Sequence, residues 1–366
     1  MKNILIDNAP MKRLAVAPMM DWTDRQCRTF HRSLTKKAVL YSEMVTTGAL
    51  IYGDVPRHLD FDEVQHPVVL QLGGSEPQDL ATSAKLAKKW GYDEIDLNCG
   101  CPSERVQRGS FGACLMAEPD LVAECVKAMV DAVDIPVTVK HRIGLNDMNV
   151  QDNQQDYQFT LDFICKVAQA GASQVTIHAR NAILKGLSPK ENRTIPPLRF
   201  EIAKQLRIDA QKHFPHLKVL LNGGLETNGD IARHWHDFDG FMIGRAAYHT
   251  PGMMLDWDEM LATDGQAFGH FFGIDQWNRI TEELINQCTQ WLKLCEKNQQ
   301  PFHMAAITRH ILGLAHGKGG SKHWRRKLSD YRLLGAVKTE RDIRGFFEDA
   351  NQELRMYVEH EESDRL

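Results

Sequence analysis

The sequence predicts a (β/α)8 TIM barrel followed by a C-terminal helical domain. Eight short, apolar, β-rich runs recur over roughly 250 residues, the size of such a barrel. Between most of them lie helix-like segments whose apolar residues fall three and four positions apart. The first run ends in Ala17-Pro18-Met19-Met20 and carries no G-x-G-x-x-G fingerprint, which argues against a doubly wound sheet.

The predicted strands are near-continuously apolar, as expected for a parallel sheet that helices cover. In order they are RLAVAPM from Arg13, AVLYSEM from Ala38, PVVLQLGG from Pro67, EIDLNCG from Glu94, PVTVKHRIG from Pro136, QVTIHAR from Gln174, KVLLNGG from Lys218 and GFMIGR from Gly240. EPQDLATSAKLAKKWG and DLVAECVKAMVDAV are examples of the predicted helices between them.

The strand pattern stops after about Trp257. One-sided apolar patterns in IDQWNRITEELINQCTQWLKLC and FHMAAITRHILGLAHG predict helices, and the basic stretch GKGGSKHWRRKLSDYR follows. We therefore expect a barrel over residues 1–260, a helical domain over 261–345 and an acidic C-terminal tail over 346–366.

Composition describes an ordinary globular protein, with 43% hydrophobic and 25% charged residues. The formal net charge of -4 gives no overall basic field for nucleic acid, so any such surface must be local. Eight scattered cysteines fit a reducing compartment rather than a disulfide scaffold. Neither a signal peptide nor a membrane span is evident, so we expect a cytoplasmic protein with no membrane partner. We also expect the protein to be a monomer.

Polar residues at the carboxyl ends of the predicted strands are the candidate active site, because barrel enzymes form their sites there. These residues are Met19, Met20, Glu43, Gln71, Asn98, Cys101, Lys140, Arg142, His178, Arg180, Asn222-Gly223-Gly224 and Gly244-Arg245. The last two groups follow strands seven and eight, where barrels often bind phosphate. The alternative is that these glycines only make tight turns.

Lys140 has three interpretations: a Schiff-base nucleophile, a cation that faces a cofactor, or a solvated charge. The alternation in VTVKHR points Lys140 inward and disfavours the third. His178 is a candidate metal ligand or phosphate partner. Metal binding has little other support, because neither Cys-x-x-Cys nor His-Glu-x-x-His occurs and His234-Trp-His236 lies away from the strand ends.

The segment LNCGCPSERVQRGSFGAC places two thiols on either side of Gly100. One intervening glycine does not favour a disulfide, and a zinc site would need two more ligands. Cys101 lies just past strand four and is placed to face the barrel mouth, whereas Cys99 is expected to be a buried apolar residue. A thiol with the reference pKa of ~8.5 could act as a proton donor or, once activated, as a nucleophile.

Long sequence blocks resemble the tRNA-dihydrouridine synthases, and their A-type subgroup most closely. The blocks are LAVAPMMDWTDRQCRTFHR, LQLGG, LNCGCPSERVQRGSFGACLM, VKHRIG, HARNAILKGLSPKENRTIPPL, NGG and MIGRAAYHTP. The resemblance implies an FMN-dependent oxidoreductase that uses NADPH to reduce the C5=C6 bond of uridines 20 and 20a in the tRNA D-loop. The sequence has no nucleotide motif for NADPH, an absence that is expected if NADPH and tRNA use one mouth in turn.

The resemblance also assigns roles to individual residues. Cys101 matches the catalytic general acid that protonates C5 of the uracil. Asn98 matches a uracil contact, Lys190 and Arg193 match tRNA contacts, and Arg309 with the basic stretch to Arg326 lies in the helical RNA-binding domain. The positions that match flavin contacts are Pro18, Met19, Met20, Gln71, Lys140, His178, Asn222, Gly223, Gly224, Gly244 and Arg245.

Three other functions compete with this one. A flavin barrel that acts on a free pyrimidine would turn over isolated uridine as well as tRNA. A Schiff-base aldolase using Lys140 would be colourless and trapped by borohydride. A non-catalytic RNA-binding protein would never consume NADPH.

Overall fold

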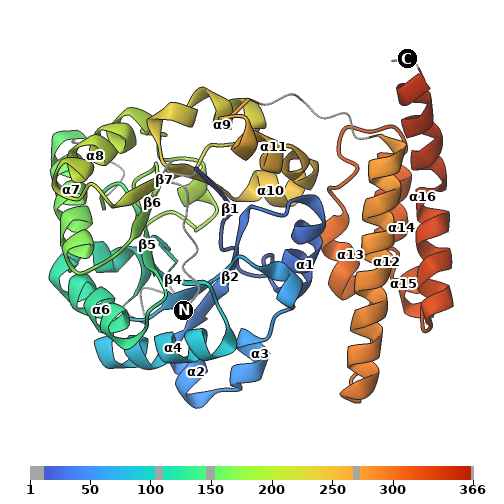
Figure 1. The fold of residues 1–366 in the computed structure, drawn as a ribbon, viewed down its shortest axis with the longest axis horizontal. Helices are drawn as coiled ribbons and strands as arrows, with labels where there is room; N and C mark the ends of the chain where they lie inside the picture. Colours follow the sequence, from blue (N-terminus) through green and yellow to red (C-terminus); the bar gives the residue numbers. More distant parts are fainter. Residues whose placement is uncertain (1–11, 104–108, 110, 146–152, 267–272, 364–366) are drawn as a thin grey trace.

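Eight parallel strands close into a barrel, in chain order, in the computed structural model (Figure 1). The structure describes residues 12–103, 109, 111–145, 153–266 and 273–363. All eight predicted strands are confirmed. They are β1 (Arg13–Val16), β2 (Val39–Thr46), β3 (Val68–Gly73), β4 (Glu94–Cys99), β5 (Val137–Arg142), β6 (Gln174–His178), β7 (Lys218–Asn222) and β8 (Gly240–Ile243).

Helices follow the strands and form the outer ring of the barrel (Figure 1). Local sequence sets their ends: Pro77 and Pro119 occupy first turns, where a missing N–H costs nothing, and Gly91 ends one helix with φ of 91°. The helices are α1 (Arg25–Leu34), α2 (Thr47–Tyr52), α3 (Val55–Leu59), α4 (Pro77–Trp90), α6 (Pro119–Ala132), α7 (Asn153–Gln169), α8 (Phe200–His213), α9 (Asn228–Arg233), α10 (Arg245–His249) and α11 (Trp257–Ala262).

The strand period of two separates an apolar outside from an inside that is partly polar. On β4, Ile95 and Leu97 belong to the large core between sheet and helices. Asp96, between them, bonds to residues of the two neighbouring strands within the barrel. Near the amino ends of the strands, Arg13 pairs with Glu94 and donates to Gln174 Oε1 at 2.8 Å. Polar side chains thus line part of the barrel interior, whereas the inward positions Ala15, Val39, Tyr41, Val69 and Met242 of β1, β2, β3 and β8 form a small apolar cluster.

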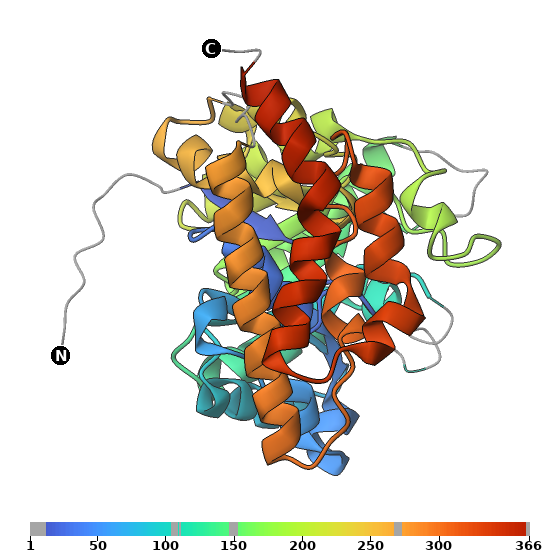
Figure 2. The same ribbon diagram turned by 90° about the vertical axis from the view of Figure 1, so that its right-hand side faces the viewer.

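The helical domain comprises α12 (Ile274–Lys297), α13 (Ala305–Ile311), α14 (Ser321–Ser329), α15 (Tyr331–Ala336) and α16 (Glu340–Ser363). It packs on one side of the barrel, with α13 and α12 against α1 (Figures 1 and 2). Buried Trp277 of α12 meets Trp324 of α14 at 5.1 Å between ring centroids and donates to Asn351 Oδ1 of α16.

The predicted domain boundary at residue 346 falls inside α16. Rather than forming a separate tail, this segment continues as a helix to Ser363, and its residues Leu354 and Val358 are fully buried. The acidic residues Glu348, Asp349 and Glu359 are exposed on the same helix, so net charge hid the helical period. Residues 364–366 lie outside the described part of the chain.

In the described part of the chain, every helix is too short or too polar to cross a membrane.

Candidate active site

A cleft of 2120 Å³ opens at the carboxyl ends of the barrel strands and extends to the helical domain, where Trp291 and Asn298 line it. Most of the predicted site residues meet there. Those that line it are Pro18, Met19, Met20, Gln71, Asn98, Cys101, Lys140, His178, Arg193, Asn222, Gly223, Gly224, Gly244 and Arg245. Lys190, Arg309 and Arg326 are not in the lining. Lys190 precedes a short turn in the β6–α8 loop, Arg309 lies on α13 and Arg326 on α14.

Two side-chain amides and one carboxylate form a hydrogen-bonded relay beneath the cleft. Asn98 Oδ1 accepts from the N–H groups of Gly100 and Cys101, at 3.1 and 3.0 Å. Asn98 Nδ2 donates to Gln71 Oε1 at 2.9 Å, and Gln71 Nε2 donates to Asp96 Oδ2 at 2.7 Å. The relay therefore connects the backbone of Cys101, through Gln71 of β3, to the buried carboxylate of Asp96 on β4.

Asp96 is fully buried at the base of this relay. Its second carboxylate oxygen accepts from Thr138 Oγ1 at 2.7 Å. Burial raises the pKa of Asp96 to about 6, although the hydrogen bonds from Gln71 and Thr138 and the charge of Lys140 favour the ionised form. Sequence inspection missed this residue, yet it lies two positions before Asn98 and so on the same strand face.

Cys101 is half-buried at the mouth, whereas Cys99 is fully buried in the outer core, as predicted. The Cys101 thiol donates to Ser103 Oγ at 3.5 Å, and its carbonyl accepts from Ala113 N at 2.9 Å. Burial raises the pKa of the Cys99 thiol well above its usual value. Only Cys101 of the two thiols is therefore accessible for chemistry in the cleft.

Lys140 and Arg142 both point into the barrel from β5 but differ in function. Lys140 Nζ donates to Asn222 Oδ1 at 3.0 Å, and burial together with the charge of Arg142 lowers the pKa of Lys140 to about 8. Arg142 donates instead to the carbonyls of Gly100, Asn181 and Asn192, at 2.9, 3.0 and 2.9 Å. Arg142 thus ties the Cys101 loop to the β6–α8 loop, whereas the side-chain hydrogen bond of Lys140 leads to Asn222, also in the cleft lining.

Gly223 and Gly224 form a backbone cradle after β7. Both have left-handed backbones, with φ of 94° and 70°. A Cβ at Gly223 would lie 2.3 Å from His178 Cδ2, so only glycine fits against this imidazole. Burial and the nearby charges of Arg142 and Lys140 lower the pKa of His178 well below its usual value, so the ring is neutral at pH 7.

Positive charge accumulates beside this cradle. Arg193 and Arg245 line the cleft there, and Arg180 is near enough to feel the charge of Arg245. None of the three forms an ion pair with a carboxylate of the described residues, although the charge of Glu226 acts on Arg180. Burial and the charge of Arg245 lower the pKa of both Arg180 and Arg193. Arg180 Nε is buried and has no protein acceptor among the described residues. Excess cations next to exposed backbone form a site for an anion such as a phosphate.

Metal ligands do not cluster in the part of the chain that the structure describes: nowhere there do three or more His, Cys, Asp or Glu side chains gather in a way that could hold an ion.

Comparisons with known proteins identify the family of this chain. Residues 15–350 match the family model described as dihydrouridine synthase (Dus). A Pseudomonas putida protein named tRNA-dihydrouridine(20/20a) synthase is 49% identical over 320 residues, which are 87% of this chain and 89% of the relative. A Vibrio vulnificus protein of the same name is 50% identical over 319 residues, 87% of this chain and 91% of the relative. The chain is therefore a member of the dihydrouridine synthase family of oxidoreductases.

Proposed function

We propose that this protein reduces the C5=C6 bond of uridines 20 and 20a in the tRNA D-loop, with FMN as cofactor and NADPH as reductant. The names of the relatives support the substrate. One observation carries the proposal: the accessible thiol of Cys101, the Lys140 cation and the glycine–arginine cradle open into a single cleft. Its volume of 2120 Å³ leaves room for a cofactor and a nucleotide together.

The residues present fit FMN. Gly223, Gly224 and Gly244 would hold the phosphate with Arg245 and neutral His178. Arg180, whose Nε has no acceptor among the described residues, is near enough to His178 for its charge to lower the pKa of that ring. Lys140 would lie at the N1 and C2-carbonyl edge of the ring and stabilise negative charge there. Gln71 and the segment Pro18–Met20 would contact the ring. When bound, reduced FMN would supply the hydride that adds to C6 of the uracil.

The protein itself supplies binding groups and a proton. Hydride addition at C6 leaves enolate character at C5, which must be protonated. The Cys101 thiol would donate this proton, and Asn98 would orient the uracil. Both groups are held by one unit, since Asn98 Oδ1 accepts from the Cys101 N–H at 3.0 Å. The Cys101 thiol and the Asn98 amide that would contact the uracil are therefore held at a constant distance from each other.

The target base must leave its stack to reach the cleft, so the RNA backbone has to be held outside it. Arg193 at the rim, Lys190 beside it and Arg326 on α14 would contact phosphates. NADPH and tRNA would occupy the mouth in turn, giving ping-pong kinetics. We place the reaction in the cytoplasm and assign it to a monomer.

Incubation of the flavin-loaded protein with NADPH and an unmodified tRNA transcript tests the proposal. We expect one NADPH to be consumed for each dihydrouridine formed, with the product mapped to positions 20 and 20a. Equal activity on free uridine would favour a free-pyrimidine reductase. A colourless protein that borohydride traps on Lys140 would favour the aldolase.

A further inference from the structure

The β1–α1 loop, residues 17–24, has a strained backbone at the edge of the cleft. Its first part contributes Pro18, Met19 and Met20 to the cleft lining. Asp21 follows with φ of 64°, a left-handed conformation that non-glycine residues adopt only when their surroundings impose it. The contacts that hold Asp21 therefore also determine where the preceding three residues lie.

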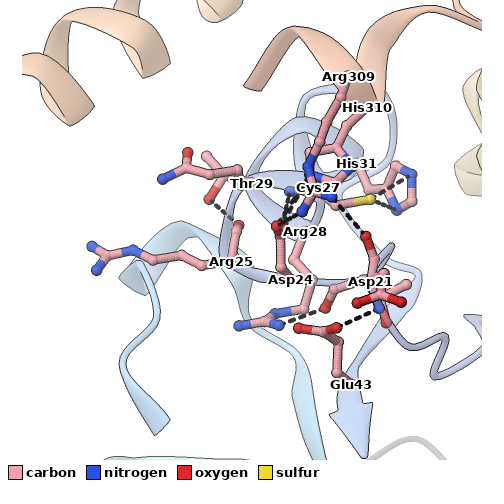
Figure 3. A network of polar contacts seen from close by, with 12 residues as sticks. Asp21, Asp24, Arg25, Cys27, Arg28, Thr29, His31, Glu43, Arg309 and His310 are labelled. Carbon is pink, nitrogen blue, oxygen red and sulfur yellow. Dashed lines mark hydrogen bonds and ion pairs between the residues drawn. The ribbon is translucent and has the colours of Figure 1, made fainter. Parts of the chain in front are cut away.

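Both backbone groups of Asp21 are bonded, each to a different part of the molecule. Its N–H donates to Glu43 Oε1 of β2 at 2.6 Å. Its carbonyl accepts from Arg309 of α13 at 3.0 Å, across the interface between barrel and helical domain (Figure 3). The strained residue is thus held between a barrel carboxylate and a guanidinium of the helical domain.

The end of the loop is held by the same helix. Asp24 caps α1 by accepting from Cys27 N at 2.9 Å, and it also pairs with Arg309 and with His310 Nε2, the latter at 3.0 Å (Figure 3). Burial alone would raise the pKa of Asp24, but hydrogen bonds from His310 and Cys27 and the charge of Arg309 keep it below its usual value.

The side chain between these two anchors is also immobilised. Trp22 stacks on Tyr248 of α10 with ring centroids 4.4 Å apart and an angle of 12° between the planes. The hydroxyl of Tyr248 lies 3.2 Å from His310 Nδ1. Adjacent residues 309 and 310 of α13 therefore contact the turn at Asp21, the cap at Asp24 and the partner of Trp22.

We propose that Arg309 is a positioning residue for the flavin site, which acts by holding the β1–α1 loop in the conformation that lays Pro18, Met19 and Met20 along the cofactor. The inference rests on the proposed function in that FMN occupies this side of the cleft. It gives Arg309 a role different from the RNA contact that the resemblance implies. The helical domain then shapes the cofactor site even when no RNA is bound.

Release of FMN from the purified holoenzyme, followed by flavin fluorescence on dilution without RNA, tests this role. Arg309→Gln should raise the dissociation constant of FMN about tenfold, as expected for the loss of a hydrogen bond from a charged donor. Arg344→Gln is the matched control. Arg344 is a similarly exposed arginine that pairs with Glu282 within the helical domain, at 2.8 Å, and its loss should leave FMN release unchanged.

Substitutions at Asp21 test the same loop from the barrel side, even if Arg309→Gln fails to fold. Asp21→Gly should keep FMN affinity, because glycine adopts positive φ freely and the hydrogen bonds with Glu43 and Arg309 involve only the backbone N–H and C=O of residue 21. Asp21→Val should lose affinity, because a β-branched residue resists this conformation.

Two results would overturn the inference. In the first, Arg309→Gln releases FMN as the parent protein does but has a raised KM for tRNA, which would make Arg309 an RNA contact. In the second, Asp21→Val releases FMN as the parent protein does. A parent protein that binds no flavin would overturn the proposed function as well, so the two failures are distinguishable.

Discussion

Asn98 Nδ2 donates to Gln71 Oε1 over 2.9 Å, and this contact sets the direction of both amides beneath the cleft. The acceptor of each amide is thereby used: Asn98 Oδ1 receives two backbone N–H groups, and Gln71 Oε1 receives Asn98. What remains for a ligand is one N–H on each amide. Such a surface favours a carbonyl-bearing ring such as uracil over cytosine, which carries an amino group at C4.

Removal of the Asp96 carboxylate should disrupt the relay, because it removes the acceptor that orients Gln71. In Asp96→Leu, Gln71 Nε2 loses its acceptor in a buried position, and we expect at least a tenfold lower kcat for dihydrouridine formation. Asp96→Asn keeps an acceptor oxygen for Gln71 and should retain most of this activity. Steady-state kinetics of the two variants compare the effects, and equal losses in both would show that charge matters rather than orientation.

Asp96 should also make stability depend on pH. Aspartate titrates near ~3.9 in an unfolded chain, and burial raises the pKa of Asp96 to about 6. Between these values the folded state binds more protons, so the free energy of unfolding falls as pH rises from about 4 to about 6. Asp96→Asn has no titrating group at this position. The free energy of unfolding of Asp96→Asn minus that of the parent should therefore rise between about pH 4 and about pH 6 and stay constant at higher pH. Urea unfolding at several pH values measures the difference; curves parallel throughout would contradict it.

Replacement of Cys101 by alanine should abolish most turnover without loss of flavin. General-acid catalysis contributes about 10²- to 10⁴-fold, and we expect a fall in kcat within that range. The visible flavin spectrum and tRNA affinity should stay at parental values. Cys165→Ala, a half-buried thiol on α7, is the control and should remain active. Undiminished dihydrouridine formation by Cys101→Ala would exclude the acid role.

Flavin reduction by NADPH should slow at alkaline pH. Burial and the charge of Arg142 lower the pKa of Lys140 to about 8, so its positive charge is lost as pH rises through that value. Arginine stays charged throughout, so Lys140→Arg should show a flat profile above pH 8, even if its rate is lower. Stopped-flow reduction between pH 7 and 10 compares the two proteins. An identical alkaline fall in both would assign the transition to another group.

Gly223→Ala should weaken FMN binding. The added Cβ would lie 2.3 Å from His178 Cδ2 at a residue with φ of 94°, so the cradle must deform. We expect at least tenfold faster flavin release on dilution. Gly229→Ala in α9 is the control, because its Cβ would meet only Thr227 Oγ1, at 3.6 Å. Flavin retention equal to that of the parent in Gly223→Ala would remove this cradle from the cofactor site.

Lys190→Ala should weaken tRNA binding and its dependence on salt. Loss of one phosphate contact should reduce the slope of log affinity against log salt by about one. Lys212→Ala on α8, an exposed lysine that pairs with Asp209, should leave the slope unchanged. Filter binding from 50 to 200 mM salt measures both variants. An unchanged slope for Lys190→Ala would place it outside the interface.

The residues at the mouth could be predicted from sequence because strand period and barrel topology together fix which side chains meet there. Lys140 and Asn222, 82 positions apart, are both inward residues at strand ends and bond at 3.0 Å. No such rule relates Arg309 to Asp21, since their contact depends on how α13 docks against α1. Likewise, Arg142 follows the strand pattern, but only the positions of three loop carbonyls show that its donors are already used.

Because α16 contributes to the core of the helical domain, the order of synthesis affects how the chain folds. Every strand of the barrel has been synthesised once residue 243 is added, whereas Phe347 and Asn351 of α16, which contact Trp324 and Trp277, follow more than a hundred residues later. The barrel can therefore assemble before the core of the helical domain is complete. A nascent chain stalled before α16 would present two indoles to the chaperone machinery.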